Sequence, residues 1–273
     1  MRFIAVFLSF ASSLSVFSAV AGSPPPESVQ KFQYETALRA SQDAIGKAPA
    51  DYPLTDEKGR ALSLHDLRGK PLVLSLIYTS CYYICPMTTK HLSKVVEKAR
   101  DALGNDSFNV ALLGFDAYND TPQAMLHFAQ NQGVADAGWH LLSADPETAT
   151  ALTKELGFVF FASPNGFDHI VQATVLDADG RIYRQVYGEV FDTPLLVEPL
   201  KDLVLGRPTP DQTFIADLIN RVRFFCTTYD PSRDAYHFDY SLFVGMAIGA
   251  LIILSGSVFV VRELRKRRPS HRA

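Results

Sequence analysis

The feature that most constrains this chain is an uncharged, apolar run at residues 241–261. About 20 apolar residues suffice for a helix to cross the hydrocarbon core of a bilayer. Residues 262–273 then bring six basic side chains against one acidic one, and such clusters remain in the cytoplasm. A buried core helix would not need this basic stop. We therefore predict a transmembrane helix over 241–261, a basic cytoplasmic tail over 262–273, and an interfacial aromatic belt formed by Tyr236, Phe238 and Tyr240.

The N-terminus has the pattern of a secretory signal. Arg2 precedes a long apolar stretch that ends in Ala19-Val20-Ala21, a small-residue cleavage motif. This pattern predicts a signal peptide over residues 1–21, and an uncleaved membrane anchor is the alternative. Either reading, together with the positive C-terminal tail, places the body of the chain on the periplasmic or extracytoplasmic side of the cell membrane. With the signal peptide cleaved, the chain is expected to be a single-pass protein tethered by its C-terminus.

Composition excludes several classes of protein. Of the 273 residues, 47% are hydrophobic and 20% are charged, which rules out a disordered or fibrous chain. The formal net charge is −3 although both ends are basic, so the body between them is acidic and offers no basic face for nucleic acid. The three cysteines are too few for a disulfide-stabilised scaffold.

Alternation of strand and helix patterns organises the body. Residues 22–50 are a proline-containing spacer and a helix, 51–205 one compact domain, and 206–240 a helical linker. The apolar runs at 72–78 and 108–115 are typical of strands buried on both faces. Helices are expected after each of them, and a hairpin over 173–186 turns at Asp177-Ala178-Asp179-Gly180. This pattern predicts an α/β fold with a central mixed sheet flanked by helices.

The chemistry is concentrated in Cys81 and Cys85, which is followed by Pro86. The pair comes directly after a predicted buried strand, at the start of a helix, where α/β folds place their sites. A helix N-terminus stabilises thiolate, which is the reactive and metal-binding form of cysteine. Two thiolates and an imidazole suit Cu(I), among other soft or borderline metals. Buried structural cysteines are the alternative.

Other candidate ligands are less certain from spacing. Seven histidines are present, and His169 stands out only because it follows the predicted loop 163–168. Met87 is more simply a helix core residue, and Asp116 and Asp120 are more simply loop charges near a helix start. Cys226 is the odd thiol, unpaired, buried or available for an intermolecular or metal contact.

Three segments together resemble a known family. YTSCYYICP, GFDAYNDTP and FDHIVQATVLDADGRIYR are similar to the signatures of the Sco/SenC proteins, and the resemblance covers roughly residues 51–201. These are thioredoxin-like, membrane-tethered copper-binding proteins of cytochrome c oxidase assembly. The resemblance implies that Cys81, Cys85 and His169 bind copper, that Asp168 supports the histidine, and that the partner is a terminal oxidase subunit or another copper protein.

Two functions are compatible with these residues. The first is a copper metallochaperone that passes its ion to a respiratory terminal oxidase by ligand exchange. The second is a thiol–disulfide oxidoreductase in which Cys81 and Cys85 form a redox-active disulfide and keep the cysteines of a client copper site reduced. A three-residue separation differs from the CxxC redox motif and disfavours the second. A peroxidase is disfavoured because Tyr78 stands where a threonine would be expected.

Overall fold

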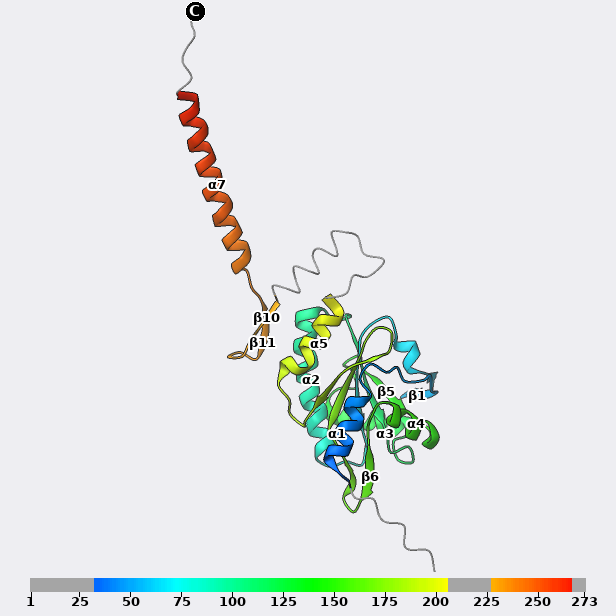
Figure 1. Cartoon of the computed structure of the whole chain (residues 1–273). Coiled ribbons are helices and arrows are strands. Elements are labelled where there is room, and N and C mark those ends of the chain that lie inside the picture. Colours follow the sequence, from blue (N-terminus) through cyan, green and yellow to red (C-terminus); the bar gives the residue numbers. More distant parts are fainter. Residues whose placement is uncertain (1–31, 206–226, 267–273) are drawn as a thin grey trace, which may run out of the picture. The chain divides into compact units, whose positions relative to one another are not determined.

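A computed structural model describes residues 32–205 and 227–266 (Figure 1). The predicted signal peptide, residues 22–31, residues 206–226 of the predicted linker with Cys226, and residues 267–273 lie outside the described residues. The elements in chain order are α1 (Tyr34–Asp43), β1 (Leu54–Asp56), β2 (Ala61–Leu62), η1 (Leu64–Leu67), β3 (Leu72–Ile77), α2 (Ile84–Leu103), β4 (Asn109–Gly114), α3 (Pro122–Gln132), β5 (His140–Ser143), α4 (Pro146–Glu155), β6 (Phe160–Ser163), β7 (Gly166–His169), β8 (Gln172–Leu176), β9 (Ile182–Tyr187), α5 (Thr193–Leu205), β10 (Thr227–Asp230), β11 (Ala235–Phe238) and α7 (Ser241–Lys266).

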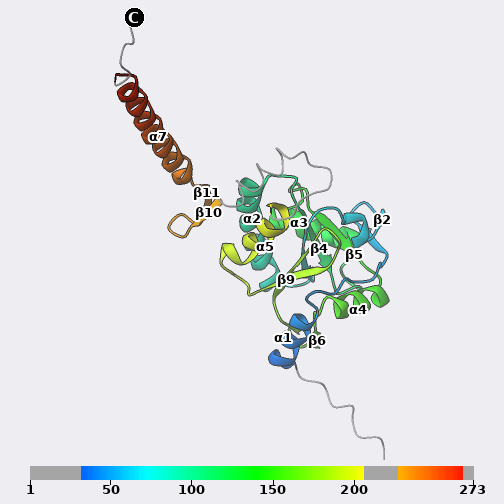
Figure 2. The same cartoon turned by 45° about the horizontal axis from the view of Figure 1, so that its top comes forward.

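A seven-stranded mixed sheet forms the centre of the domain, in the order β2-β1-β5-β4-β3-β8-β9 (Figure 2). The β3–β4 and β4–β5 pairs are parallel, as their helical crossovers require, and the other pairs are antiparallel. The predicted mixed α/β sheet with flanking helices is therefore confirmed.

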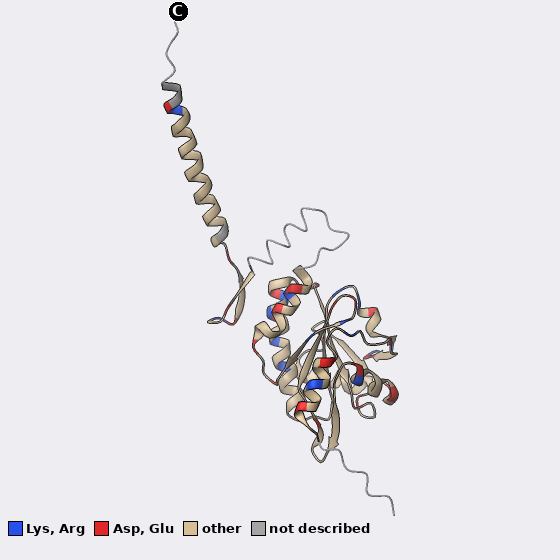
Figure 3. Ribbon diagram, viewed as in Figure 1, with Lys and Arg blue, Asp and Glu red and all other residues tan. Residues whose placement is uncertain are grey.

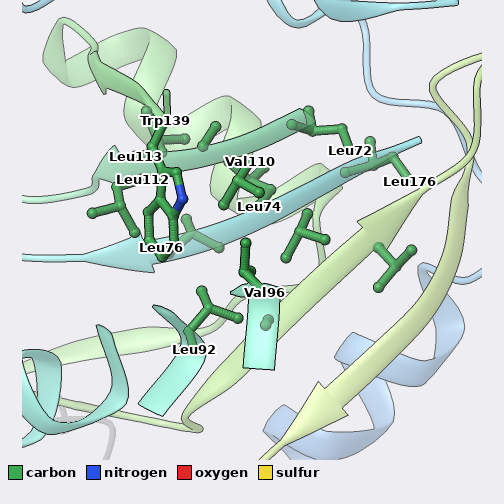
Figure 4. Close-up of a cluster of buried hydrophobic side chains, with 14 of the residues drawn as sticks. Leu72, Leu74, Leu76, Leu92, Val96, Val110, Leu112, Leu113, Trp139 and Leu176 are labelled. Carbon is green, nitrogen blue, oxygen red and sulfur yellow. The ribbon is translucent and has the colours of Figure 1, made fainter. Parts of the chain in front are cut away.

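Strand β3 is the central strand on which the site depends. All six of its residues are buried, because β4 and β8 flank it and helices cover the sheet. Leu74 and Leu76 pack with Leu112 of β4 and Leu92 of α2 in the cluster of Figure 4. Burying side chains of this size contributes roughly 1.5–3 kcal/mol each. The carboxyl end of β3 is thus a rigid support for the residues that follow it.

Local signals fix both ends of α3 and the turn of the β8–β9 hairpin. Thr121 caps α3 by accepting the Ala124 N–H at 3.2 Å, and Pro122 occupies the first helical position. Gly133 ends the same helix in the left-handed conformation, with φ +73°. In the β8–β9 turn, one carboxylate oxygen of Asp177 accepts two backbone N–H groups. The β8–β9 hairpin matches the predicted range of 173–186 within a few residues.

The predicted loop at 163–168 is wrong. The chain forms a short hairpin there, in which β6 and β7 pair antiparallel and Phe160 lies opposite His169. The two strands form a sheet of their own and do not join the seven-stranded sheet. His169 is consequently the last residue of a strand rather than a loop residue.

The predicted helical linker over 206–240 is wrong for its described part. Strands β10 and β11 form an antiparallel hairpin that packs on α2 and α5. Lys98 of α2 pairs with Asp234, and the Lys201 ammonium donates to the Thr227 carbonyl at 2.6 Å. Tyr236, expected in an aromatic belt, is half-buried and donates its hydroxyl to Glu198 at 2.8 Å. The hairpin is therefore an integral part of the domain surface.

Helix α7 contains the apolar run that the sequence analysis singled out. Phe243–Glu263 has a mean hydropathy of 2.4, which makes it long and apolar enough to cross a membrane, and none of it is buried in the protein. Figure 3 shows that charged side chains are absent from the helix until its last described turns. An uncovered apolar helix of this length is a candidate membrane anchor.

Candidate metal centre

The two thiols lie where β3 leads into α2. Cys81 is 9% exposed and precedes the helix, whereas Cys85 is 3% exposed and belongs to its first turn. Tyr83, the N-cap residue, makes no side-chain cap. The Cys81 sulfur replaces that cap, because it accepts the backbone N–H of Cys85 at 3.3 Å and also that of Tyr83. A reactive sulfur thus satisfies N–H groups that a helix N-terminus leaves without partners.

The electrostatics of the pair are asymmetric. A hydrogen bond from the Cys85 thiol, the helix N–H groups and a hydrogen bond from Tyr78 lower the pKa of Cys81 to about 4. Proximity to the Cys81 sulfur and burial raise the pKa of Cys85 far above its usual range. The hydrogen bonds around the two sulfurs therefore favour ionisation of Cys81 over ionisation of Cys85. A thiolate is both a nucleophile and a ligand for soft metals.

His169 approaches this end of the sheet from the β6–β7 hairpin. Its ring packs against Phe158, Phe115 and Tyr78, with ring centroids 5.1, 5.5 and 6.3 Å away. Nδ1 lies 2.9 Å from the Ile170 carbonyl oxygen, to which it can only donate. Burial lowers the pKa of His169, so the ring is neutral near pH 7 and Nε2 carries a lone pair. A neutral imidazole is the metal-binding form.

Asp168 precedes His169 in β7 and is exposed. Successive strand residues point to opposite faces, so its carboxylate and the His169 ring diverge. The Nδ1 partner is the Ile170 carbonyl, and Asp168 acts on the ring through its charge, which raises the pKa of His169. A supporting role for Asp168 stays a prediction.

The fold brings the three sequence-predicted ligands to one end of β3, but not into a closed site. Cys81 is close enough to His169 for its charge to raise the pKa of the ring. Nowhere in residues 32–205 and 227–266 do three histidine, cysteine or acidic side chains stand grouped as metal ligands. Closure around one ion therefore requires a shift of the His169 hairpin toward the thiols.

Asp120 is a site residue whose role the sequence analysis understated. It is 1% exposed, and one oxygen accepts both the N–H and the hydroxyl of Thr79, each at 2.7 Å. The other oxygen accepts the Asp116 N–H at 2.9 Å. Burial raises the pKa of Asp120 to about 6. The carboxyl fixes the segment that leads from β3 to Cys81.

Gly114 makes room for this buried carboxyl. A Cβ atom at Gly114 would lie 2.4 Å from the Asp120 Cβ, a distance that side chains do not tolerate. A glycine at the end of a buried strand, six residues before an acid that precedes a helix cap, was the sequence signal for this packing.

Met87 was expected in the core but is only half-buried. It lines an open groove of about 520 Å³ together with Tyr34, Tyr83, Ile170 and Tyr187. Two of its lining residues are close to the predicted ligands in sequence, since Met87 lies two residues after Cys85 and Ile170 directly follows His169. Close to the thiols, Tyr82 is 98% exposed and Tyr83 69% exposed. Exposed aromatic side chains of this kind are enriched in protein–protein interfaces.

Comparisons with known proteins agree on one family. The family model described as SCO1/SenC matches residues 41–204. The SCO1 protein homolog of Bacillus subtilis is 26% identical over 159 residues, which cover 56% of this chain and 80% of that protein.

Solved structures share the fold. A crystal structure of an Aquifex aeolicus protein is 31% identical, with a TM-score of 0.54 over 62% of this chain and 98% of that one. Yeast Sco1 with copper bound has a TM-score of 0.52 at 16% identity, over 62% and 96%. BsSco, described as having a disulfide switch and as a member of the Sco family of cytochrome c oxidase assembly proteins, has a TM-score of 0.50 at 20% identity, over 60% and 96%.

Proposed function

Because the chain belongs to the SCO1/SenC family, we propose that it is a membrane-tethered metallochaperone that delivers copper to a copper site of a respiratory terminal oxidase. The observation that carries this proposal is the placement of two buried thiols and the His169 ring at the same end of β3. Cys81 is the more readily ionised sulfur, Cys85 its hydrogen-bonded partner, and His169 lies on the adjacent hairpin. Soft thiolates and imidazole are ligands that hold Cu(I). A relative from yeast with this fold holds copper.

In this proposal copper is cargo. Cys81 binds first because it is already deprotonated, and Cys85 releases its proton when it joins the ion. The His169 hairpin then supplies the third ligand from its Nε2 atom. Release reverses the order: a soft ligand of the client enters as one of these three leaves, so the ion stays protein-bound throughout. The exposed Tyr82 and Tyr83 give the client a surface beside the thiols.

The apolar helix supports the proposed location. The apolar part of α7 would span the cell membrane, with the basic residues from Arg262 onward in the cytoplasm, as the positive-inside rule requires. The copper-binding domain would then face the periplasmic or extracytoplasmic side. A terminal oxidase subunit or another copper protein in the same membrane is the expected partner.

Copper loading of the full chain in detergent tests this function. We expect about one Cu(I) per chain, with sulfur and nitrogen ligands in X-ray absorption. In His169→Ala the nitrogen ligand should disappear. The Cu(I) affinity should fall by more than the 10–100-fold loss that is typical when a residue hydrogen-bonded to a metal ligand is mutated. His127→Ala is the matched control, because His127 is exposed on α3. Failure of the wild type to retain copper, or an unchanged ligand set in His169→Ala, would overturn the proposal.

A second candidate function is favoured by the asymmetry of the thiols. A thiolate next to a buried thiol is the arrangement that attacks a client disulfide and then resolves the mixed disulfide. Cys81 would bond to one client sulfur while the other leaves as thiolate. Cys85 would then displace the client, leaving a Cys81–Cys85 disulfide and a reduced client. Cys85→Ser should trap the mixed disulfide on a non-reducing gel, and Cys81→Ser should trap none. Equal trapping by both variants would contradict this role.

A further inference from the structure

Tyr78 carries a buried hydroxyl at the junction of the thiols and the His169 hairpin. It is the first residue after β3 and is 7% exposed. Its ring packs edge-on against Phe115 at 5.4 Å and Phe167 at 5.2 Å between centroids. A hydroxyl buried among aromatic rings needs hydrogen-bond partners, since leaving it without them costs about 1–3 kcal/mol.

The Tyr78 hydroxyl lies between the Cys81 sulfur and the backbone of β7. The Phe167 N–H of β7 and the Cys81 sulfur are the groups from which the hydroxyl can accept a hydrogen bond and to which it can donate its single proton. The β7 backbone comes unusually close at this point. A Cβ atom at Gly166 would lie 2.7 Å from the Tyr78 hydroxyl oxygen, and the φ of +118° at Gly166 also requires glycine. One atom thus joins the thiolate to the hairpin.

His169 shares this hairpin and the same strand face. Residues two apart in a strand point to the same side, so Phe167 and His169 both face Tyr78. Their rings lie 5.2 and 6.3 Å from the Tyr78 ring. Because β6 and β7 pair with each other and not with the central sheet, the angle of the hairpin depends on contacts such as this one.

We propose that Tyr78 is a positioning residue: its hydroxyl bridges the Cys81 sulfur and the β7 backbone and sets the approach of His169 to the thiol pair. The inference rests on the proposed copper-binding function and deepens it. Tyr78 is not itself a ligand. Phenylalanine at this position would keep the ring packing but lose both hydrogen bonds, and the hairpin would then be free to take orientations in which His169 misses the ion.

Tyr78→Phe tests the bridge through two readouts on the full chain. In the reduced, metal-free protein, amide hydrogen exchange at Phe167 should accelerate, because its N–H loses its acceptor. In the copper-loaded protein, Cu(I) affinity measured by competition with a chromophoric chelator should fall about 10-fold or more. The nitrogen contribution in X-ray absorption should weaken as well, a change that a general loss of stability does not produce.

Tyr52→Phe is the matched control, because it removes a half-buried tyrosine hydroxyl that donates to Glu155 at 2.8 Å away from the thiols. It should leave both readouts at their wild-type values. Unchanged Phe167 exchange, or equal copper affinity in Tyr78→Phe and wild type, would overturn the inference. A wild type that binds no copper would overturn the proposed function instead, and the exchange measurement would still decide whether Tyr78 holds the hairpin.

Discussion

Replacing Cys81 with serine is expected to abolish stoichiometric Cu(I) binding. The substitution removes the one sulfur that is deprotonated at neutral pH, and it leaves Cys85 as a buried thiol. A serine hydroxyl is a hard, protonated donor with little affinity for Cu(I). The expected loss of Cu(I) affinity exceeds the 10–100-fold loss caused by mutating residues that hydrogen-bond to metal ligands. Copper retained after gel filtration of the full chain, quantified against protein, measures it.

The third cysteine provides the control for this experiment. Cys226→Ser removes a thiol that lies outside the proposed site in the sequence, so copper retention should equal that of the wild type. The same comparison decides whether Cys226 is a metal contact, a role that the sequence analysis left open. One equivalent of copper bound to Cys81→Ser would contradict the assignment of the thiolate.

Asp120→Ala is expected to destabilise the domain by roughly 4 kcal/mol at pH 4. The variant leaves the partly buried N–H and hydroxyl of Thr79, and the partly buried N–H of Asp116, without their acceptor, and each donor left without a partner costs about 1–3 kcal/mol. Urea unfolding of the reduced, metal-free chain, followed by fluorescence of the buried Trp139, the only tryptophan in the chain, gives the difference.

The stability difference between the wild type and Asp120→Ala should decrease as the pH rises. The pKa of Asp120 is about 6 in the folded state and 3.8 in its reference state. Between these values the folded protein binds the proton more tightly than the unfolded chain, so the wild type loses stability as pH rises. The difference of about two units between the folded and reference pKa values corresponds to a loss of about 3 kcal/mol in the free energy of unfolding. The cost of Asp120→Ala should therefore shrink to roughly 1 kcal/mol at pH 7.

An exposed carboxylate supplies the control for the pH series. Asp106→Ala removes a charge at the surface and should change stability by less than about 0.5 kcal/mol at every pH. A cost of Asp120→Ala that stays constant from pH 4 to pH 7 would show that Asp120 does not carry the raised pKa.

The central fold was predictable because its signals are local. The apolar run of β3, which only Ser75 interrupts, the Thr121-Pro122 helix start and the Asp177–Gly180 turn each specify an element within a few residues. The hairpin of β6 and β7 was missed because Ser163-Pro164-Asn165-Gly166 dominates its composition, and strands of four residues leave little room for an alternating pattern. The hairpin of β10 and β11 is short in the same way, and contacts with α2 and α5 stabilise it.

The site was predictable in its residue types but not in its polarity. Spacing identified Cys81 and Cys85, and family resemblance identified His169. Which thiol ionises depends on the N–H groups and the Tyr78 hydroxyl around each sulfur. The burial of Asp120 depends on the absence of a side chain at Gly114, because the Asp120 side chain occupies that space. The first depends on how residues 78–85 fold at the junction of β3 and α2, and the second on the contact between Gly114 of β4 and the loop that follows it, so residue spacing alone does not determine either.

The link between the last hairpin and the apolar helix would restrict how this protein meets the client of the proposed function. Only Asp239 and Tyr240 separate β11 from α7, a connection that spans roughly 10 Å when extended. Since the hairpin contacts α2 and α5, this two-residue link tethers the whole domain to α7. With α7 in a bilayer, encounters become lateral diffusion in two dimensions, and the local concentration of membrane-resident clients rises accordingly. Freely soluble acceptors gain no such advantage.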